Sequence, residues 1–301
     1  MKNELIDLLK KEGMNPDEIS DANVNKFADL IKEIGKRETK HIKASEISKN
    51  LKTSLIGKNL YIFNEVGSTN TIAKYLSEND VSTGSVIISE KQNGGKGRSG
   101  KSWQSPLGGI WLSIILNPNV DSMKIPIITL ATGVAVERSL EKIGIENPEI
   151  KWPNDIMIGA KKVCGILTEA VTKLNSIETV VVGVGIDANL NIEDFPKDLQ
   201  KTTTSIEHEL GKKVDENQLI KIFFEEFENI YELYSHEKYE EILKEWRKSS
   251  YSIGKIVEVR KPYRKAYDAY IVGISNDGAL VVEKNDGTLE KVISGECTIK
   301  N

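Results

Sequence analysis

The chain has 301 residues, of which 39% are hydrophobic and 29% are charged, so it is long enough for more than one domain and has the composition of a soluble protein. Its formal net charge of −4 argues against a general nucleic-acid binder, because such proteins usually carry a basic surplus. Two cysteines and three histidines are too few for a disulfide framework, a structural zinc site or an imidazole-based metal site, so any metal would bind oxygen ligands.

The N-terminal part of the sequence predicts a short helical lead over residues 1–55. Its charges nearly balance, and its apolar residues recur at helical spacing, namely Leu5, Leu8, Leu9, Phe27, Leu30, Ile31 and Ile34. The sequence shows neither a signal-peptide pattern nor an apolar run long enough to span a membrane. We therefore expect a cytoplasmic protein without a membrane partner.

The middle of the chain alternates strand-like and helix-like segments. Helical periodicity covers residues 69–79 and 124–143, and strand-like runs cover residues 59–63, 85–89, 110–116, 149–158, 162–171 and 178–187. Such alternation predicts an α+β fold in which one mixed sheet is flanked by helices.

In the last third of the chain, the spacing of the apolar residues changes from a helical period to a period of two. Residues 215–248 are helical with an aromatic stripe that we interpret as core, whereas the sequence after Gly254 alternates with a period of two. Asp277-Gly278 and Asp286-Gly287 are typical of hairpin turns. Residues 251–301 are thus expected to form a small C-terminal β-barrel.

The segment "GGKGRSGKSW" at residues 94–103 has the spacing of a phosphate-binding P-loop. A P-loop requires a helix to begin at the Lys-Ser pair, but Pro106, Gly108 and Gly109 follow here, and the next periodic stretch is a strand. The segment is therefore predicted to be a basic, glycine-rich loop between two strands. Lys96, Arg98 and Lys101 favour an anionic ligand.

Four further stretches carry polar residues at the ends of predicted elements. "GSTN" ends at Asn70, where Ser68 or Thr69 could cap a helix or help to bind an anion or carbonyl at its N-terminus. "KWPND" at residues 151–155 groups a lysine, an aromatic residue and an aspartate around a proline, and "KKVCGILTE" places Lys162 at the start of an apolar strand. "VVVGVGIDANLN" ends a buried strand with Asp187, Asn189 and Asn191, whose oxygens suit Mg²⁺.

Taken in this order, the five stretches over roughly residues 55–301 resemble the catalytic core of biotin protein ligases. The resemblance implies a class II synthetase-like core over residues 56–250, followed by an SH3-like β-barrel over residues 251–301. It also implies that biotin and ATP form biotinyl-5′-AMP with Mg²⁺, after which biotin passes to a lysine of a biotin carboxyl carrier protein domain. The oligomeric state stays open, a homodimer included.

The resemblance also implies a set of site residues. Lys162 and Arg98 would be catalytic, with Lys162 between the biotin carboxylate and the α-phosphate, and Asp187 would be the metal ligand. The residues expected to bind biotin and ATP are Ser68, Thr69, Asn70, Gln92, Gly95, Lys96, Gly97, Arg98, Lys101, Trp103, Lys151, Asn154, Asp155, Lys162, Gly165, Gly185, Asp187 and Asn189.

The sequence departs from the family pattern at three of these positions. The family's glycine-rich loop reads G-R-G-R-x-G-R-x-W, so Lys96 and Lys101 replace arginines and keep the charge without the forked hydrogen bonding. Asp187 stands where the family pattern G-I-G-x-N-x-N has asparagine, which strengthens a metal ligand but removes an amide contact.

Three other functions remain as alternatives. A related lipoate or octanoate ligase would use a different basic loop, and a bifunctional ligase and repressor would need a DNA-binding lead, whereas residues 1–55 show no clear helix-turn-helix pattern. A module that only binds biotin would not need Lys162 beside a basic loop. We interpret Cys164 as a core residue, because the three histidines lie outside the motifs and offer it no base.

Overall fold

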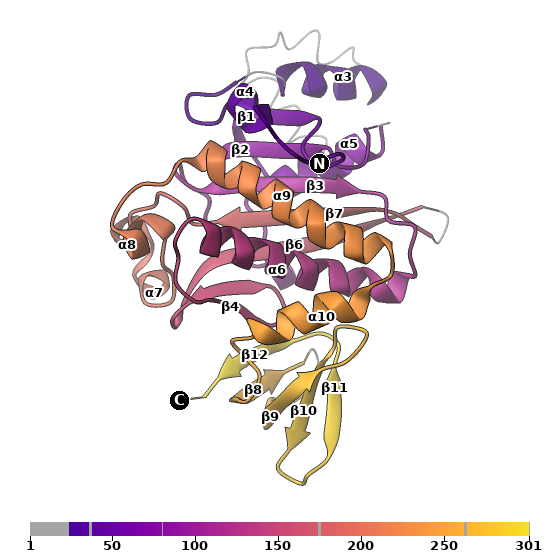
Figure 1. Cartoon of the computed structure of the whole chain (residues 1–301), viewed down its shortest axis with the longest axis vertical. Coiled ribbons are helices and arrows are strands. Elements are labelled where there is room, and N and C mark those ends of the chain that lie inside the picture. Colours follow the sequence, from indigo (N-terminus) through magenta and orange to yellow (C-terminus); the bar gives the residue numbers. More distant parts are fainter. Residues whose placement is uncertain (1–23, 36–37, 80, 174–175, 262–263, 301) are drawn as a thin grey trace.

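The computed structural model describes residues 24–35, 38–79, 81–173, 176–261 and 264–300. Within this part of the chain, seven strands form one sheet in the order β1-β2-β3-β7-β6-β5-β4 (Figure 1). The strands are β1 Leu60–Val66, β2 Val86–Gln92, β3 Ile110–Leu116, β4 Pro148–Lys151, β5 Asp155–Ile158, β6 Lys161–Lys173 and β7 Ser176–Ile186. β1 and β2 are parallel and the other neighbours are antiparallel, so the expected mixed sheet is confirmed.

Side-chain alternation gives the two faces of this sheet different roles. On β3 and β7, Ile110, Leu112, Val182 and Val184 point into the main core. Helices α6 Ile125–Lys142 and α9 Glu216–Ser235 pack against each other over that face (Figure 1). The opposite face carries α5 Thr69–Ser77 and a second, smaller core that includes Val181. The functional site lies on this second face.

Two segments are divided where the sequence suggested one element. The run 149–158 is a hairpin of β4 and β5, because Trp152, Pro153 and Asn154 form a turn in which the proline has no N–H to pair. The helical stretch 215–248 is α9 followed by α10 Tyr239–Lys248. Glu237, with a φ of 59°, lies in the break between these two helices.

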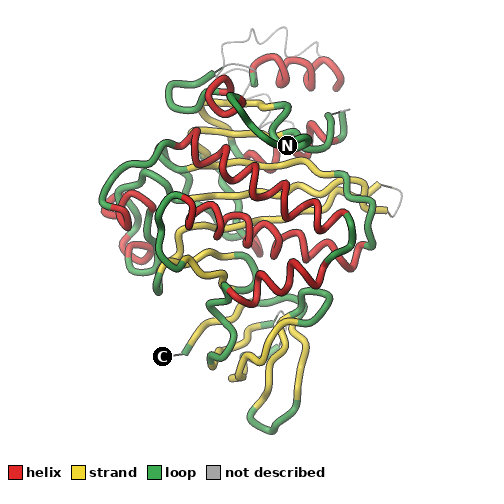
Figure 2. The backbone as a smooth tube through the Cα atoms, viewed as in Figure 1, coloured by secondary structure: helices red, strands yellow, loops and turns green. Residues whose placement is uncertain are grey.

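The C-terminal module is an antiparallel sheet in the order β11-β10-β9-β8-β12 among the described residues, as expected. Figure 2 shows this end of the chain as strands joined by loops. Its strands are β8 Ile256–Arg260, β9 Tyr267–Ile274, β10 Leu280–Lys284, β11 Leu289–Val292 and β12 Glu296–Ile299. Gly278 and Gly287 take φ values of 81° and 80° in the two turns, a conformation that glycine adopts without strain. Trp152 Nε1 donates to Gly278 O (3.2 Å), which joins the module to the β4–β5 turn.

The described part of the lead packs against the seven-stranded sheet. In α3 Val24–Ile34, Ile31 and Ile34 share a buried cluster with Phe63 of β1, and Ile62 N donates to Gly35 O (2.5 Å). Ile47 of α4 Ala44–Ser48 belongs to the main core. The periodic positions Leu5, Leu8 and Leu9 lie outside the described residues. The domain boundaries at residues 55 and 250 stay predictions.

The remaining helical segments are short. They are η1 Arg98–Gly100, η2 Ser122–Lys124, η3 Ile192–Asp194, α7 Lys197–Gln200 and α8 Ile206–Leu210. Of the helices in the described residues, none combines the length and the apolar character that crossing a bilayer would require.

Candidate active site

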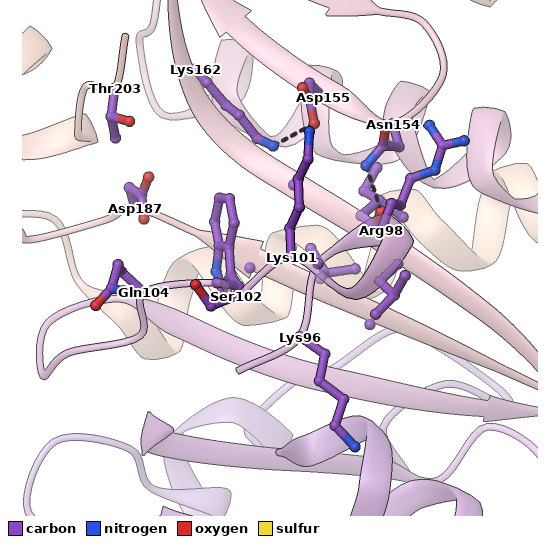
Figure 3. Close-up of a pocket in the computed structure, with 18 of the residues that line it drawn as sticks. Lys96, Arg98, Lys101, Ser102, Gln104, Asn154, Asp155, Lys162, Asp187 and Thr203 are labelled. Atoms are coloured by element: carbon purple, nitrogen blue, oxygen red, sulfur yellow. Dashed lines mark hydrogen bonds and ion pairs between the residues drawn. The ribbon is translucent and has the colours of Figure 1, made fainter. Parts of the chain in front are cut away.

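A cavity of about 470 Å³ opens on the α5 face of the sheet, beside the glycine-rich loop (Figure 3). Three glycines on adjacent strands form part of its wall: Gly165 on β6, and Gly183 and Gly185 on β7. Each occupies a position where the neighbouring residues of the same strand point into the core, so a Cβ would point to the cavity side of the sheet. There it would meet Trp103 at Gly165 (3.1 Å) and Gly185 (2.4 Å), and Asn70 at Gly183 (2.2 Å). The glycine pattern at the end of the apolar run 180–186 therefore lets the side chains of Asn70 and Trp103 lie directly against β7 in the cavity.

The glycine-rich loop connects β2 to β3 as a small hairpin. Gly97 N donates to Lys101 O (2.7 Å), and Lys96 pairs with Ser102 in an isolated bridge. Lys101 has extended backbone angles, φ −68° and ψ 147°, at the position where a P-loop would begin its helix. The prediction of a loop between two strands is thus confirmed.

The three cations of the loop point to different partners. The guanidinium of Arg98 donates from Nη1 to Asn154 Oδ1 (3.1 Å), and Lys101 forms an ion pair with Glu296 of β12. Burial lowers the pKa of Arg98 from its ordinary value, although nearby Asp155 and Glu296 oppose that effect.

Lys96 lies apart from this group. Its Nζ donates to Thr71 Oγ1 of α5 (2.8 Å), and Figure 3 shows it pointing away from Lys162 and Asp155. Arg98 and Lys101 are therefore the loop cations on the side of the cavity that holds Lys162.

Trp103 covers the glycine wall. Its Nε1 lies 2.4 Å from the position that a Cβ at Gly185 would occupy, so the ring can lie there only because that residue is glycine. The ring meets Trp111 edge-on at a centroid distance of 6.4 Å, and Lys162 Nζ lies 4.7 Å from its centroid. Nε1 is buried without a hydrogen-bond partner among the described residues, so a ligand atom could accept from it.

Asp187 follows β7 and is buried beside Lys162. Burial raises the pKa of Asp187 well above its usual range, with the Lys162 charge acting in the opposite direction. Its Oδ1 is buried and has no hydrogen-bond partner in the described part of the chain. The same residues contain no group of three or more His, Cys, Asp and Glu side chains placed to hold a metal ion. A divalent cation here would thus take part of its ligands from a substrate, with Asp187 and Asp155 as the carboxylates at hand.

The cavity floor is a strip of hydrogen-bonding side chains at the start of α5. Ser68 occupies the N-cap position, but within the described residues its side chain makes no capping bond, so capping does not explain it. Instead, Thr69 N donates to Gln92 Oε1 (2.8 Å), and Gln92 Nε2 donates to Ser105 Oγ (2.9 Å). Ser113 of β3 contacts both Thr69 and Asn70 from below.

The structure brings most of the expected site residues into this one cavity. They are Ser68, Thr69, Asn70, Gln92, Lys96, Gly97, Arg98, Lys101, Trp103, Lys151, Asn154, Asp155, Lys162, Gly165, Gly185 and Asp187.

Gly95 and Asn189 were expected to bind a ligand but are not among the residues that line the cavity. Gly95 shapes the loop, since its carbonyl accepts from Trp103 N (2.9 Å) and a Cβ would lie 2.4 Å from Trp103 O. The Asn189 amide donates to Val214 O (2.9 Å) and Glu216 Oε1 (3.0 Å), and the residue lines a separate cavity of about 260 Å³. The chain turns after β7, so the alternation of the strand does not continue to residue 189.

Several lining residues were missed by the sequence interpretation. Glu296, Cys297 and Thr298 come from the C-terminal module, and Thr202 and Thr203 come from the segment after α7. Local patterns do not show which distant segments reach a cavity. Ser113, which contacts the floor residues from below, was also missed. Its position as a serine within the buried run "IWLSIIL" is a signal that could have identified it.

Comparison with known proteins gives a consistent assignment. Residues 63–187 match the biotin/lipoate A/B protein ligase family, and residues 252–300 match the biotin protein ligase C terminal domain. The chain is 33% identical over 292 residues to the bifunctional ligase/repressor BirA of Bacillus subtilis, which covers 97% of this chain and 86% of the relative. It is 26% identical over 257 residues to BirA of Escherichia coli, covering 84% and 78% of the two chains.

The fold agrees with this match. A biotin protein ligase from Aquifex aeolicus, solved in complex with biotin and ATP, superposes with a TM-score of 0.71 at 26% identity and covers 81% of this chain and 99% of that one. The ligand-free structure of the same protein has a TM-score of 0.67 at 24% identity. With the two-part match, the glycine-rich loop and the cavity described above, the chain belongs to the biotin protein ligase family.

Proposed function

We propose that the protein activates biotin with ATP to give biotinyl-5′-AMP and pyrophosphate, and then transfers biotin to a lysine of a biotin carboxyl carrier protein domain. The observation that carries the proposal is that Lys162 and Arg98 lie in the same cavity as the hydrogen-bonding floor around Thr69 and Gln92. Two anionic reactants need such cations, and an acid with a polar head group needs such a floor.

In the first step, a carboxylate oxygen of biotin attacks the α-phosphorus of ATP, and the bond to pyrophosphate breaks. Lys162, from the start of β6, is placed to stabilise the charge on both groups, and Arg98 to hold the phosphates. In the second step, a carrier lysine attacks the carbonyl carbon of the anhydride, AMP leaves, and the amine loses a proton. That step requires no nucleophile from the enzyme, in keeping with a buried Cys164 whose pKa is raised well above its usual value by burial.

Trp103 is placed to cover the adenylate, and we expect adenine to stack on its ring. Mg²⁺ would be held by Asp187 with phosphate oxygens and would neutralise phosphate charge when bound.

The floor also supports biotin over lipoate. Biotin carries a ureido group with two N–H donors and a carbonyl acceptor, whereas the dithiolane ring of lipoate offers sulfur atoms that form only weak hydrogen bonds. The Thr69, Asn70 and Gln92 side chains suit the first head group.

The experiment that tests this function is pyrophosphate release from ATP with biotin, lipoate or octanoate as the acid, with and without a carrier domain. We expect release with biotin, followed by labelling of the carrier lysine. Release that responds to lipoate and not to biotin would overturn the proposed specificity. Release without any transfer to a carrier domain would overturn the second step.

A second candidate function, ligase and transcriptional repressor, is favoured by one observation. The match to the Bacillus subtilis relative covers 97% of this chain, so it extends into residues 1–55. Selection of duplex DNA from a random-sequence library, in the presence of biotin and ATP, would test it. Enrichment of one sequence would support regulation, and recovery of none would leave the ligase as the function.

A further inference from the structure

The turn between β4 and β5 is bonded to the C-terminal module through one residue, Trp152. This side chain is 3% exposed, and its indole Nε1 donates to Gly278 O (3.2 Å), in the turn between β9 and β10. The backbone N of Trp152 donates to Ser252 Oγ (3.3 Å). The reaction described above assigns no task to Trp152, although both its backbone and its side chain contact the module.

The β9–β10 turn of the module lies directly against α6. A Cβ at Gly278 would lie 3.1 Å from Leu130 Cδ1 and 3.5 Å from Ile127 Cγ1, and both of these α6 residues are buried. At the same turn, Lys124 Nζ donates to Asn276 O (3.2 Å). The carbonyl that accepts from the indole is therefore fixed in place by the packing of the module on α6.

The other side of the β4–β5 turn holds the two cations of the proposed mechanism (Figure 3). Asn154 Oδ1 accepts from Arg98 Nη1 (3.1 Å), and Asp155 Oδ1 lies 2.5 Å from Lys162 Nζ. The placement of both cations thus depends on where this turn lies.

The turn has two supports, β6 and the module. Ile166 of β6 is bonded to Asn154 in both directions, because its N donates to Asn154 O (2.9 Å) and its O accepts from Asn154 Nδ2 (2.9 Å). With this support alone, the turn could pivot about the two bonds. The bonds of Trp152 to the module remove that freedom, and Pro153, whose ring fixes one backbone dihedral, joins Trp152 stiffly to Asn154.

We propose that Trp152 is a positioning residue, through which the C-terminal module fixes the β4–β5 turn and with it the placement of Arg98 and Lys162 for the adenylation step. The inference rests on the proposed function and adds to it a residue that acts through the partners of the two cations. The floor around Thr69 and Gln92 belongs to α5 and β2, and among the described residues no hydrogen bond joins it to this turn. The effect should therefore be on the rate of adenylation and not on the affinity for biotin.

The test begins with two tryptophans. Trp152→Phe keeps an aromatic ring in the core and removes the indole N–H. The control is Trp246→Phe on α10, because Trp246 is 0% exposed and its Nε1 has no hydrogen-bond partner within the described residues. We expect Trp152→Phe to slow single-turnover pyrophosphate release about tenfold, whereas the Kd for biotin, from calorimetry without ATP, changes less than about twofold. Trp246→Phe should leave both quantities near the wild-type values.

A second pair of variants changes the module instead of the indole. Gly278 and Gly287 have φ values of 81° and 80°, so alanine strains the two turns to a similar degree. Only Gly278→Ala also places a Cβ against α6, since no described atom lies within 4 Å of a Cβ at Gly287. Gly278→Ala should slow adenylation about tenfold and Gly287→Ala should not, and adding Trp152→Phe to Gly278→Ala should have little further effect. This pair stays readable if Trp152→Phe fails to fold.

The outcomes distinguish the positioning role from the function on which it rests. A normal rate for Trp152→Phe, equal slowing by the two alanine variants, or fully additive losses in the double variant would overturn the positioning role. A loss of biotin affinity parallel to the loss of rate would overturn it too, because the substitution would then disturb the whole cavity. If the wild type releases pyrophosphate with lipoate and not with biotin, the proposed function fails, and the same variants are compared with lipoate as the acid.

Discussion

Lys162 and Asp155 form an ion pair across the β5–β6 hairpin, with 2.5 Å between Lys162 Nζ and Asp155 Oδ1. The same Nζ lies 4.7 Å from the centre of the Trp103 ring, and its charge also acts on the buried Asp187. A substrate carboxylate that reached Lys162 would compete with Asp155 for it. The ion pair therefore holds the lysine at the cavity in the absence of substrate.

The first prediction concerns this lysine. Lys162→Ala should leave the fold intact and slow biotin-dependent pyrophosphate formation a hundredfold or more, because a group that acts on transition-state charge contributes about 3 kcal/mol. Single-turnover kinetics would measure the effect, with Lys161→Ala, the preceding residue of β6, as the control. A near-normal single-turnover rate would show that Lys162 has no part in the chemistry.

The second prediction concerns the basic loop as a cover for the intermediate. Arg98 joins the loop to the β4–β5 turn through Asn154, so Arg98→Gly should weaken retention of biotinyl-5′-AMP more than it slows its formation. The reactive anhydride would then escape and label lysines of an unrelated protein in the same tube. Arg98→Lys, which keeps the charge, should label it less. If Arg98→Gly biotinylates the bystander no more than the wild type does, the loop is not a cover.

The third prediction concerns Asp187 and Mg²⁺. If Asp187 binds the cation, Asp187→Asn should raise the Mg²⁺ concentration for half-maximal rate, because a neutral amide binds a hard cation less strongly than a carboxylate. The measurement is the initial rate of pyrophosphate release over a Mg²⁺ titration, with Asp277→Asn in the C-terminal turn as the control. An unchanged Mg²⁺ dependence would mean that Asp187 does not contact the metal.

The fourth prediction concerns stability and pH. Glu228 of α9 is 7% exposed and accepts from the backbone N–H groups of Ser54, Leu55 (2.9 Å) and Ile56 (2.7 Å). Burial acts to raise the pKa of Glu228, but these bonds outweigh it, and the pKa is lowered. A lowered folded-state pKa means that the stabilisation is present above the unfolded value and is lost as the pH falls through the folded value.

Glu228→Gln should therefore lower the free energy of unfolding by about 1–3 kcal/mol at pH 7. The difference from the wild type should shrink below about pH 4, where the unfolded carboxyl becomes protonated and then the folded one. Urea denaturation of both proteins at several pH values measures this difference in the free energy of unfolding. A difference that stays constant from pH 7 to pH 3 would show that the carboxylate charge does not contribute.

Much of the fold could be predicted because its signals are local. β3 has the bounds expected from the run Ile110–Leu116, and the glycine-rich loop lies between two strands, as the residues after Ser102 required. Pro153 and Glu237 mark where the sequence interpretation joined two elements into one. Each break follows from a backbone constraint that periodicity alone does not report.

The site was predictable to the extent that its residues lie in motifs. Lys162 and Arg98 reach one cavity, as the order of the motifs implied, but Asn189 turns to Val214 and Glu216. A strand pattern fixes the direction of a side chain only while the strand lasts, and β7 ends at Ile186.

By itself the sequence determined the helical or strand periodicity of each element and the positions of the glycines and of the cationic side chains. These features depend only on neighbours within a few residues. Only the tertiary structure decided that Glu296 pairs with Lys101, that Asn70 donates a hydrogen bond to Glu169, and that Trp103 lies over Gly185. Each of these contacts joins segments far apart in the chain, and they form only when the sheet and the C-terminal module bring those segments together. Long-range contacts depend on the packing of whole elements, which no local pattern specifies.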